Sequence, residues 1–225
     1  MSAGVAFTCY VPANVTALLI VIAGYTEAQM LALSEELCHL WDDAQQNYFK
    51  EITQNTNNGR HFDPAVEVTD KNKTINEYIK LHLIDIIKRH ATNLNLLRQV
   101  EDVFRGAIAA EFVLLICGLT AELLGGLENT YIEMPFAIMQ VGMDCLTGQG
   151  LIDANVKFEN ALYDCKWENF DVKNMKIVLL MLQNSQKTMT LSAGGITILS
   201  FSCFMSIIRL IYSAYTTLRS TLDLM

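Results

Sequence analysis

The chain has 225 residues, of which 52% are hydrophobic and only 18% charged, and its formal net charge is −8. Soluble domains of this size carry nearer a quarter charged residues, so the composition favours a membrane protein. The acidic balance argues against a nucleic-acid-binding protein, because such proteins present a basic face. With three prolines, and 12 glycines that follow no regular period, the chain is neither a disordered tail nor collagen-like.

Two charge-free stretches predict membrane-spanning helices toward the two ends of the chain. Residues 1–26 contain no charged side chain, and residues 188–208 form a second such run. A helix needs about 20 residues to cross a hydrocarbon core ~30 Å thick, so each stretch is long enough to span a membrane.

Two weaker candidate spans lie between them, and polar side chains interrupt both. These are Glu111 and Glu122 within residues 106–127, and Gln140, Asp144 and Gln149 within residues 134–152. A helix buried in a soluble core would also explain residues 134–152. Their place between better candidates nevertheless favours a four-span arrangement.

The basic residues indicate on which side of the membrane the loops lie. Of the 16 Lys and Arg residues, nine lie in 27–105, five in 153–187 and none in 128–133. The positive-inside rule therefore makes the two basic segments cytoplasmic and places both chain ends outside. An acceptor pattern for glycosylation at Asn72 should then stay unmodified.

The first residues lack the basic region and the cleavage site of a signal peptide. We therefore expect the chain to be the C-terminal part of a longer membrane protein or the product of a truncated gene model. We also expect the 225-residue form alone to be inactive, since part of any ligand pocket would be missing.

The segments between the spans are predicted to be helical too. The first span should continue as a helix beyond the membrane, until Gln54–Gly59 and His61–Pro64 form a loop. Apolar residues at three- and four-residue steps then predict an amphipathic helix over 74–105, which runs directly into the second span.

A further helix is expected just before the last span. Val172–Ser185 is amphipathic, and Asp171 is a possible N-cap for it. Gly194 and Gly195 follow, and we expect them to loosen the helix, permitting a bend or close packing. The last span is predicted from Ile196 to Leu218.

Short motifs recur along residues 180–219: Leu180-Met181, Ser185-Gln186-Lys187, Leu191, Ala193-Gly194-Gly195, Leu199-Ser200, Phe204, Tyr212-Ser213 and Leu218-Arg219. Upstream, Ala161–Trp167 (ALYDCKW) combines small residues with Tyr and Trp. Together these motifs resemble the C-terminal signature of the insect odorant receptors. The chain departs from the family pattern at Thr188, Cys203 and Ala214, where the family often has Pro, Thr and an aromatic residue.

The resemblance implies an all-α, polytopic membrane helical bundle with a cytoplasmic helical extension, of which this chain holds four of seven spans. Residues 1–30 would be the fourth span, 31–105 a cytoplasmic anchor region and 106–152 the fifth and sixth spans. Residues 153–195 would be anchor helices, and 196–220 the last span, which lines the pore. Family members are ligand-gated cation channels of the plasma membrane, assembled as tetramers with a co-receptor subunit, and they bind volatile ligands.

Three sets of site residues follow from this resemblance together with the residue pattern. Hydroxyl side chains along one face of the last span suit a water-filled ion path, although small residues also mediate helix packing. The predicted pore-lining residues are Ser206, Ser213, Thr217 and Thr221. The predicted ligand pocket, apolar with a few polar groups, comprises Phe7, Tyr10, Asn14, Phe136, Met139, Gln140 and Met143; ordinary interhelical packing is the alternative. The predicted subunit anchor comprises Tyr163, Trp167, Gly194 and Gly195.

Other classes of function explain the sequence less well. A gustatory receptor-like subunit shares the architecture but usually ends in a different Thr-Tyr pattern, and a transporter fragment should show repeated halves with broken helices. An intramembrane enzyme would have only Glu111, Glu122 and Asp144 available, without a partner pattern. We therefore expect no enzyme activity, no cofactor, no metal site and no nucleic-acid partner; membrane lipid is an expected partner.

Overall fold

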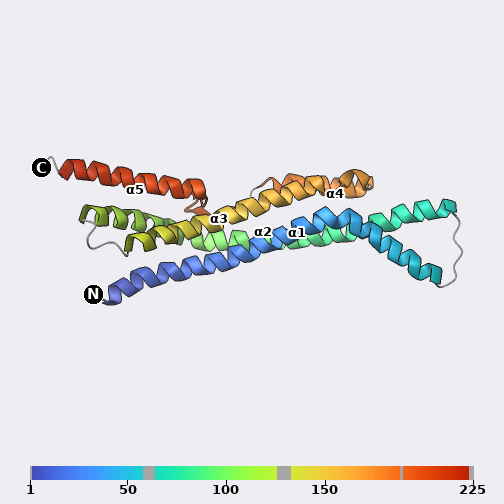
Figure 1. The fold of residues 1–225 in the computed structure, drawn as a ribbon, viewed down its shortest axis with the longest axis horizontal. Coiled ribbons are helices and arrows are strands. Elements are labelled where there is room, and N and C mark those ends of the chain that lie inside the picture. The colour runs from blue at the N-terminus through green and yellow to red at the C-terminus, as the bar shows by residue number, and fades with distance from the viewer. Residues whose placement is uncertain (1, 58–63, 126–132, 188–189, 223–225) are drawn as a thin grey trace. The chain divides into compact units, whose positions relative to one another are not determined.

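The computed structural model describes residues 2–57, 64–125, 133–187 and 190–222. Long helices dominate: α1 (Ser2–Asn57), α2 (Pro64–Gly125) and α3 (Glu133–Asp164), then a short 3-10 helix (Trp167–Asn169) and α4 (Val172–Ser185). Two-residue strands β1 (Ser192–Ala193) and β2 (Thr197–Ile198) precede the last helix, α5 (Phe201–Leu222) (Figure 1). The prediction of an all-α fold is confirmed.

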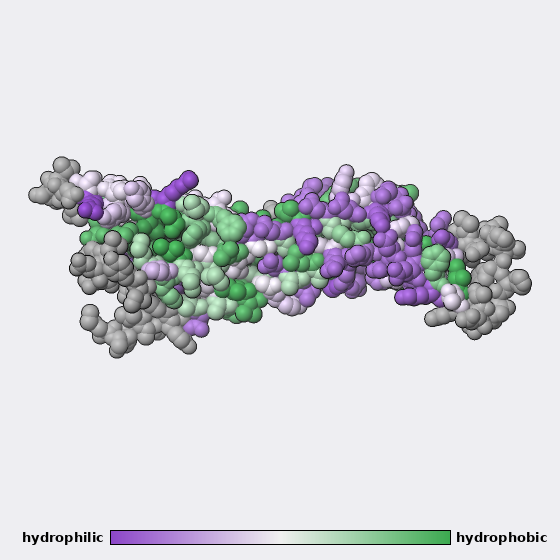
Figure 2. All heavy atoms as spheres, viewed as in Figure 1, coloured by the Kyte–Doolittle hydropathy of each residue, from purple (hydrophilic) through white to green (hydrophobic). Residues whose placement is uncertain are grey.

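The chain divides into two compact units. Unit 1 comprises residues 1–27, 96–153 and 189–225, and unit 2 comprises residues 28–95 and 154–188. Three helices, α1, α2 and α5, are long and apolar enough to cross a membrane; α3 is not among them in the described part of the chain. In Figure 2, green hydrophobic residues gather over unit 1 and purple hydrophilic residues over unit 2.

Two long helices are continuous where the sequence predicts continuity, whereas two predicted loop boundaries are wrong. α1 continues unbroken beyond the first candidate span, and α2 joins the predicted amphipathic stretch to the second candidate span. However, α1 extends through Asn57 and α2 already begins at Pro64, so part of the predicted loop is helical; residues 58–63 lie outside the described part. Proline suits the start of α2, because the first helical N–H has no partner within the helix.

The expectation for Gly194 and Gly195 is wrong, because they form a hairpin turn and not a loosened helix. Both have positive φ values, 66° and 74°, which glycine adopts at little cost. The Ile196 N–H donates to the Ala193 carbonyl at 3.1 Å and closes the turn, so Ile196 lies in the hairpin and the last helix begins five residues later than predicted, at Phe201.

The hairpin is tied to α2 within unit 1. The Gly194 N–H donates to the Arg105 carbonyl at 2.9 Å, and the Ser192 hydroxyl donates to the Glu101 carboxylate at 2.7 Å. On the other side of the hairpin, Leu199 packs against α3 so closely that a Cβ added at Gly148 would lie 2.3 Å from its carbonyl oxygen. These contacts fix the start of α5.

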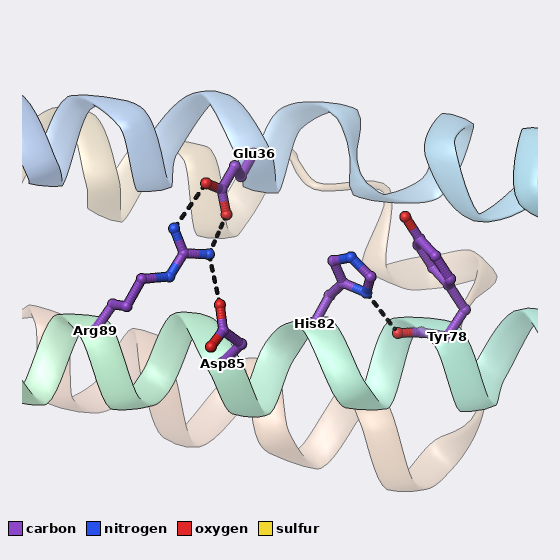
Figure 3. Close-up of polar contacts among 5 residues, drawn as sticks. All are labelled: Glu36, Tyr78, His82, Asp85 and Arg89. Atoms are coloured by element: carbon purple, nitrogen blue, oxygen red, sulfur yellow. Dashed lines mark hydrogen bonds and ion pairs between the residues drawn. The ribbon is translucent and has the colours of Figure 1, made fainter.

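Unit 2 has a core of aliphatic and aromatic side chains. Its fully buried members include Leu33, Leu37, Ile79, Leu83, Phe158 and Leu162. At its surface, Arg89 of α2 pairs with Glu36 of α1 and with Asp85, one helical turn before it; its Nη1 lies 2.8 Å from the Glu36 carboxylate (Figure 3). On the same helix the ring of His82 stacks on Tyr78, with 4.0 Å between centroids.

Candidate functional site

Unit 1 contains polar side chains that are buried among apolar helices. Thr16 comes from α1, Glu111 from α2, and Gln140 and Asp144 from α3, and each is less than a tenth exposed. Gln140 and Asp144 are four residues apart, so they lie on the same face of α3. These four residues are called the polar cluster below.

The members of the polar cluster interact across the three helices. The Gln140 Nε2 donates to the Glu111 Oε1. Asp144, which is 1% exposed, interacts with the Thr16 hydroxyl and with the charge of Glu111. However, the two Asp144 carboxylate oxygens and the Thr16 Oγ1 form no hydrogen bond of normal geometry with any described residue.

No basic side chain balances these carboxylates. The ion pairs in the described ranges join Arg89 with Glu36 and Asp85, and Lys166 with Asp42, and all of them lie in unit 2. Burying an ionised carboxylate without a partner costs free energy, and inside a membrane such residues are by default candidates for function. The polar cluster is therefore the candidate functional site.

The structure separates the predicted pocket residues. Gln140 is buried within the polar cluster, whereas Phe136, Met139 and Met143 are exposed on α3, Met139 by 66%. Asn14 is exposed on α1. Phe7 and Tyr10 belong to α1, but their side chains lie outside the described part of the structure. Thus one predicted pocket residue, Gln140, takes part in the buried site. The exposed residues Phe136, Met139 and Met143 could enclose a ligand only together with a second surface.

Sequence reasoning did not bring Thr16, Glu111 and Asp144 together. It noted both acids as interruptions of apolar stretches and as possible groups of an intramembrane enzyme, without a partner pattern. The usable signal was the four-residue step from Gln140 to Asp144 on one helix, since this step predicts a common polar face. Thr16 gives no such signal, because a threonine in an apolar helix usually bonds to its own backbone.

The predicted pore-lining residues all lie on the exposed side of α5. Ser206, Ser213, Thr217 and Thr221 are exposed, whereas Cys203, Ile207 and Ile211 form one buried row four residues apart. Three of the hydroxyls donate to carbonyls one turn back on α5: Ser206 to Ser202, Thr217 to Ser213 and Thr221 to Thr217, at 2.8–2.9 Å. Three of the four predicted pore hydroxyls are thus satisfied within their own helix.

The predicted anchor residues fall in different units. Tyr163 and Trp167 belong to unit 2 and are 68% and 39% exposed, whereas Gly194 and Gly195 belong to the hairpin of unit 1. Next to Trp167, the side chain of Phe170 is buried and its ring lies 6.0 Å from that of Trp41. Burial raises the pKa of the nearby Cys165 thiol to about 12, so this cysteine stays protonated.

The described residues hold no group of three or more His, Cys, Asp or Glu side chains that could bind a metal ion. The polar cluster has two carboxylates but no histidine or thiol among its members. Its single hydroxyl, that of Thr16, faces the Asp144 carboxylate, and the cluster contains no third group that would orient such a pair for covalent catalysis. The arrangement suits binding or charge compensation better than it suits a reaction.

In comparisons with known proteins, this chain is similar to the odorant receptors. The family model described as "7tm Odorant receptor" matches residues 1–212. Among individual proteins, Odorant receptor 49a of Drosophila melanogaster is 26% identical over 149 residues, which are 63% of this chain and 38% of the relative. Odorant receptor 85b of the same organism is 24% identical over 170 residues, 71% of this chain and 44% of the relative. The matched region therefore spans about two fifths of the length of these relatives.

A solved structure shares the fold. It is that of the insect olfactory receptor OR5 from Machilis hrabei in complex with eugenol, with a TM-score of 0.55 and 10% sequence identity. The similarity covers 92% of this chain and 68% of that receptor. At this identity the match supports the helical architecture and carries no information about ligands.

Proposed function

Because the chain belongs to the 7tm odorant receptor family, we propose that it is a subunit of an odorant-gated cation channel in olfactory neurons. The family match over residues 1–212 carries this proposal. The family is one of multi-pass membrane receptors and not of enzymes, so the expectation of a receptor without enzyme activity is confirmed by family membership.

The proposal places unit 1 in the plasma membrane and unit 2 in the cytoplasm. Exposed apolar side chains support the first part: Val21 of α1, Leu114 of α2 and Leu210 of α5 are each more than half exposed within unit 1. Such surfaces are unusual in water but ordinary against lipid. The basic residues of segments 27–105 and 153–187 support the cytoplasmic placement of unit 2.

We propose the domain limits that the sequence predicts, and the division of the chain into two compact units supports them. Residues 1–30, 106–152 and 196–220 would lie in the membrane, and 31–105 and 153–195 would form the cytoplasmic anchor. Unit 1 contains most of the proposed membrane residues, although the contacts of the hairpin with α2 place Gly194 and Gly195 in unit 1 as well.

We place the ion path along the hydroxyl face of α5. This face is exposed in the single chain, as a surface shared between subunits around a pore must be. The remaining proposed partners are an odorant co-receptor in a heterotetramer, membrane lipid, and a volatile ligand near Phe136, Met139, Gln140 and Met143. Apolar, adaptable methionines suit ligands of varied shape.

Coexpression with the co-receptor tests this function. The product of the gene and the co-receptor are expressed together, and currents evoked by a panel of volatile compounds are compared with those of the co-receptor alone. We expect a cation current that requires both proteins. If that gene product reaches the cell surface and no compound evokes more current than with the co-receptor alone, the proposal is wrong.

The pore assignment has its own test. In the coexpressed channel, Ser213→Cys and Thr217→Cys should make the current sensitive to a charged thiol reagent. Met205→Cys is the matched control, because Met205 is exposed on a different face of α5. If all three variants are equally sensitive to the thiol reagent, the hydroxyl face of α5 does not line the pore.

A further inference from the structure

We propose that the polar cluster of Thr16, Glu111, Gln140 and Asp144 binds a compact monovalent cation, with the Asp144 carboxylate as its principal ligand. The proposal concerns unit 1 alone and goes beyond channel function. It assigns a ligand to buried carboxylates that form no ion pair with any described basic residue.

The first reason is the burial of unpaired negative charge. Asp144 and Glu111 are 1% and 8% exposed, and no ion pair among the described residues involves either carboxylate. A buried carboxylate is stable only when it is paired, neutralised or bound to a cation. The Gln140 amide compensates one oxygen of Glu111, whereas Asp144 faces only the neutral hydroxyl of Thr16 and the like charge of Glu111.

The second reason is independent of the acids. Thr16 is only 6% exposed, and its Oγ1, which faces Asp144, forms no hydrogen bond of normal geometry with a described residue. A threonine in a helix ordinarily donates to the carbonyl four residues earlier, as Thr26 does to Ile22 in this same helix at 3.0 Å. An unbonded hydroxyl directed at a carboxylate is a ready oxygen ligand.

The donor set favours a small cation of single charge. Four groups could supply oxygen ligands: the Asp144 and Glu111 carboxylates, the Gln140 carbonyl and the Thr16 hydroxyl. Divalent ions such as Ca²⁺ take six to eight oxygens, several of them from carboxylates, and the described residues offer no third acid here. The same oxygens would accept either an alkali ion from the medium or the ammonium group of a small amine.

Bound there, a cation would join α1, α2 and α3 through one centre. Thr16, Glu111 and Asp144 each come from a different helix, so the bound ion would stabilise their packing. A ligand that binds only the folded state raises its stability in proportion to the logarithm of its concentration. Thermal stability therefore reports binding without any current being recorded.

The experiment uses the full chain purified in detergent. Thermal unfolding is measured in sodium, potassium or methylammonium chloride, each against the bulky N-methyl-D-glucamine chloride at equal ionic strength. We expect a saturable rise in Tm of roughly 3–6 °C at about ten times the Kd in at least one of the small cations. A response to the alkali salts identifies a medium ion, and a response to methylammonium alone identifies an amine.

Variants decide whether the polar cluster is responsible. Asp144→Asn should abolish the cation-dependent rise, whereas Asp153→Asn, which removes an exposed acid from the same helix, should keep it. If Asp144→Asn does not fold, Thr16→Val serves instead and should shift the salt dependence to higher concentration. Equal Tm in all four salts, or an unchanged response in these variants, overturns the proposal. An absence of odorant-evoked current, with the cation-dependent rise in Tm intact, would count against the proposed channel function and not against cation binding.

Discussion

At the scale of single residues, Asp171 and Asn76 fix the start of α4. The Asp171 side chain accepts from the Asn174 N–H at 2.8 Å, which confirms the predicted N-cap. Its backbone N–H donates to the Asn76 side chain of α2 at 2.9 Å, and the Asn174 amide donates to the Asn76 carbonyl. One short polar network thus both caps α4 and holds it on α2.

Asp171→Ala should destabilise the chain by about 0.5–2 kcal/mol, because it leaves an N-terminal N–H of α4 without a partner. The free energy of unfolding in detergent measures the loss. Lys173→Ala is the control, since Lys173 is exposed in the first turn of the same helix and caps nothing. Equal stability of the two variants would show that the cap contributes little.

His90 makes the stability of unit 2 depend on pH. Its ring stacks on Phe158 with 4.7 Å between centroids, and burial lowers its pKa below the usual 6.5. The unfolded chain therefore binds a proton at a higher pH than the folded chain. Stability should be complete above about pH 6.5 and should fall as the pH decreases below that value.

His90→Phe should remove this contribution, because phenylalanine keeps a ring against Phe158 and does not titrate. The measurement compares Tm at about pH 7.5 and about pH 5.5. Phe158→Leu, by contrast, should lower Tm at both values while the acid-dependent loss persists. A wild-type pH dependence in His90→Phe would assign the effect to other groups.

At the scale of elements, the junction between α3 and the start of α5 depends on Gly148. Because a Cβ there would lie 2.3 Å from the Leu199 carbonyl oxygen, the backbones must separate to admit any other residue. Gly148→Ala should therefore cost about 1–3 kcal/mol of unfolding free energy.

Gly118→Ala provides the matched comparison, since nothing lies within 4 Å of the added Cβ. Alanine favours the helix over glycine by up to about 1 kcal/mol, so this variant should be as stable as the wild type or more stable. A Gly148→Ala protein with wild-type Tm would show that α3 and Leu199 do not touch in the folded chain.

The same junction shows what hydropathy alone could predict. The charge-free run of residues 188–208 led us to expect a loosened helix at Gly194 and Gly195, but two glycines followed by β-branched residues are also a hairpin pattern. The turn prevails because both glycines adopt positive φ and because α2 offers Glu101 and the Arg105 carbonyl as partners. That partner surface comes from tertiary structure and cannot be seen in the local sequence.

At the scale of the whole molecule, apolar runs and helical periodicity predicted the all-α fold and the continuity of α2 into its span. The candidate site was not predictable as a unit. Glu111 and Asp144 are 33 positions apart, and only packing brings them together with Thr16. Spacing within one helix, as between Gln140 and Asp144, could be predicted from the sequence; contacts between helices could not.

The orientation of the whole chain can be checked at a natural acceptor pattern. Asn72-Lys73-Thr74 lies in unit 2, which we place in the cytoplasm, so expressed protein should carry no sugar at Asn72. A tag with a glycosylation site, inserted after Asn129, should be modified. Endoglycosidase-sensitive mass is the measurement, and sugar at Asn72 would reverse the proposed orientation.

The single buried row on α5 has a mechanical consequence. Among the described residues of α5, the buried side chains are Cys203, Ile207 and Ile211, and the hydroxyls of Ser206, Thr217 and Thr221 bond within α5 itself. Contact along one line restrains separation much more than it restrains rotation about that line. We therefore expect α5 to resist separation from unit 1 more than rotation about its own axis, and such a rotation would alter which side chains border the proposed neighbouring subunit.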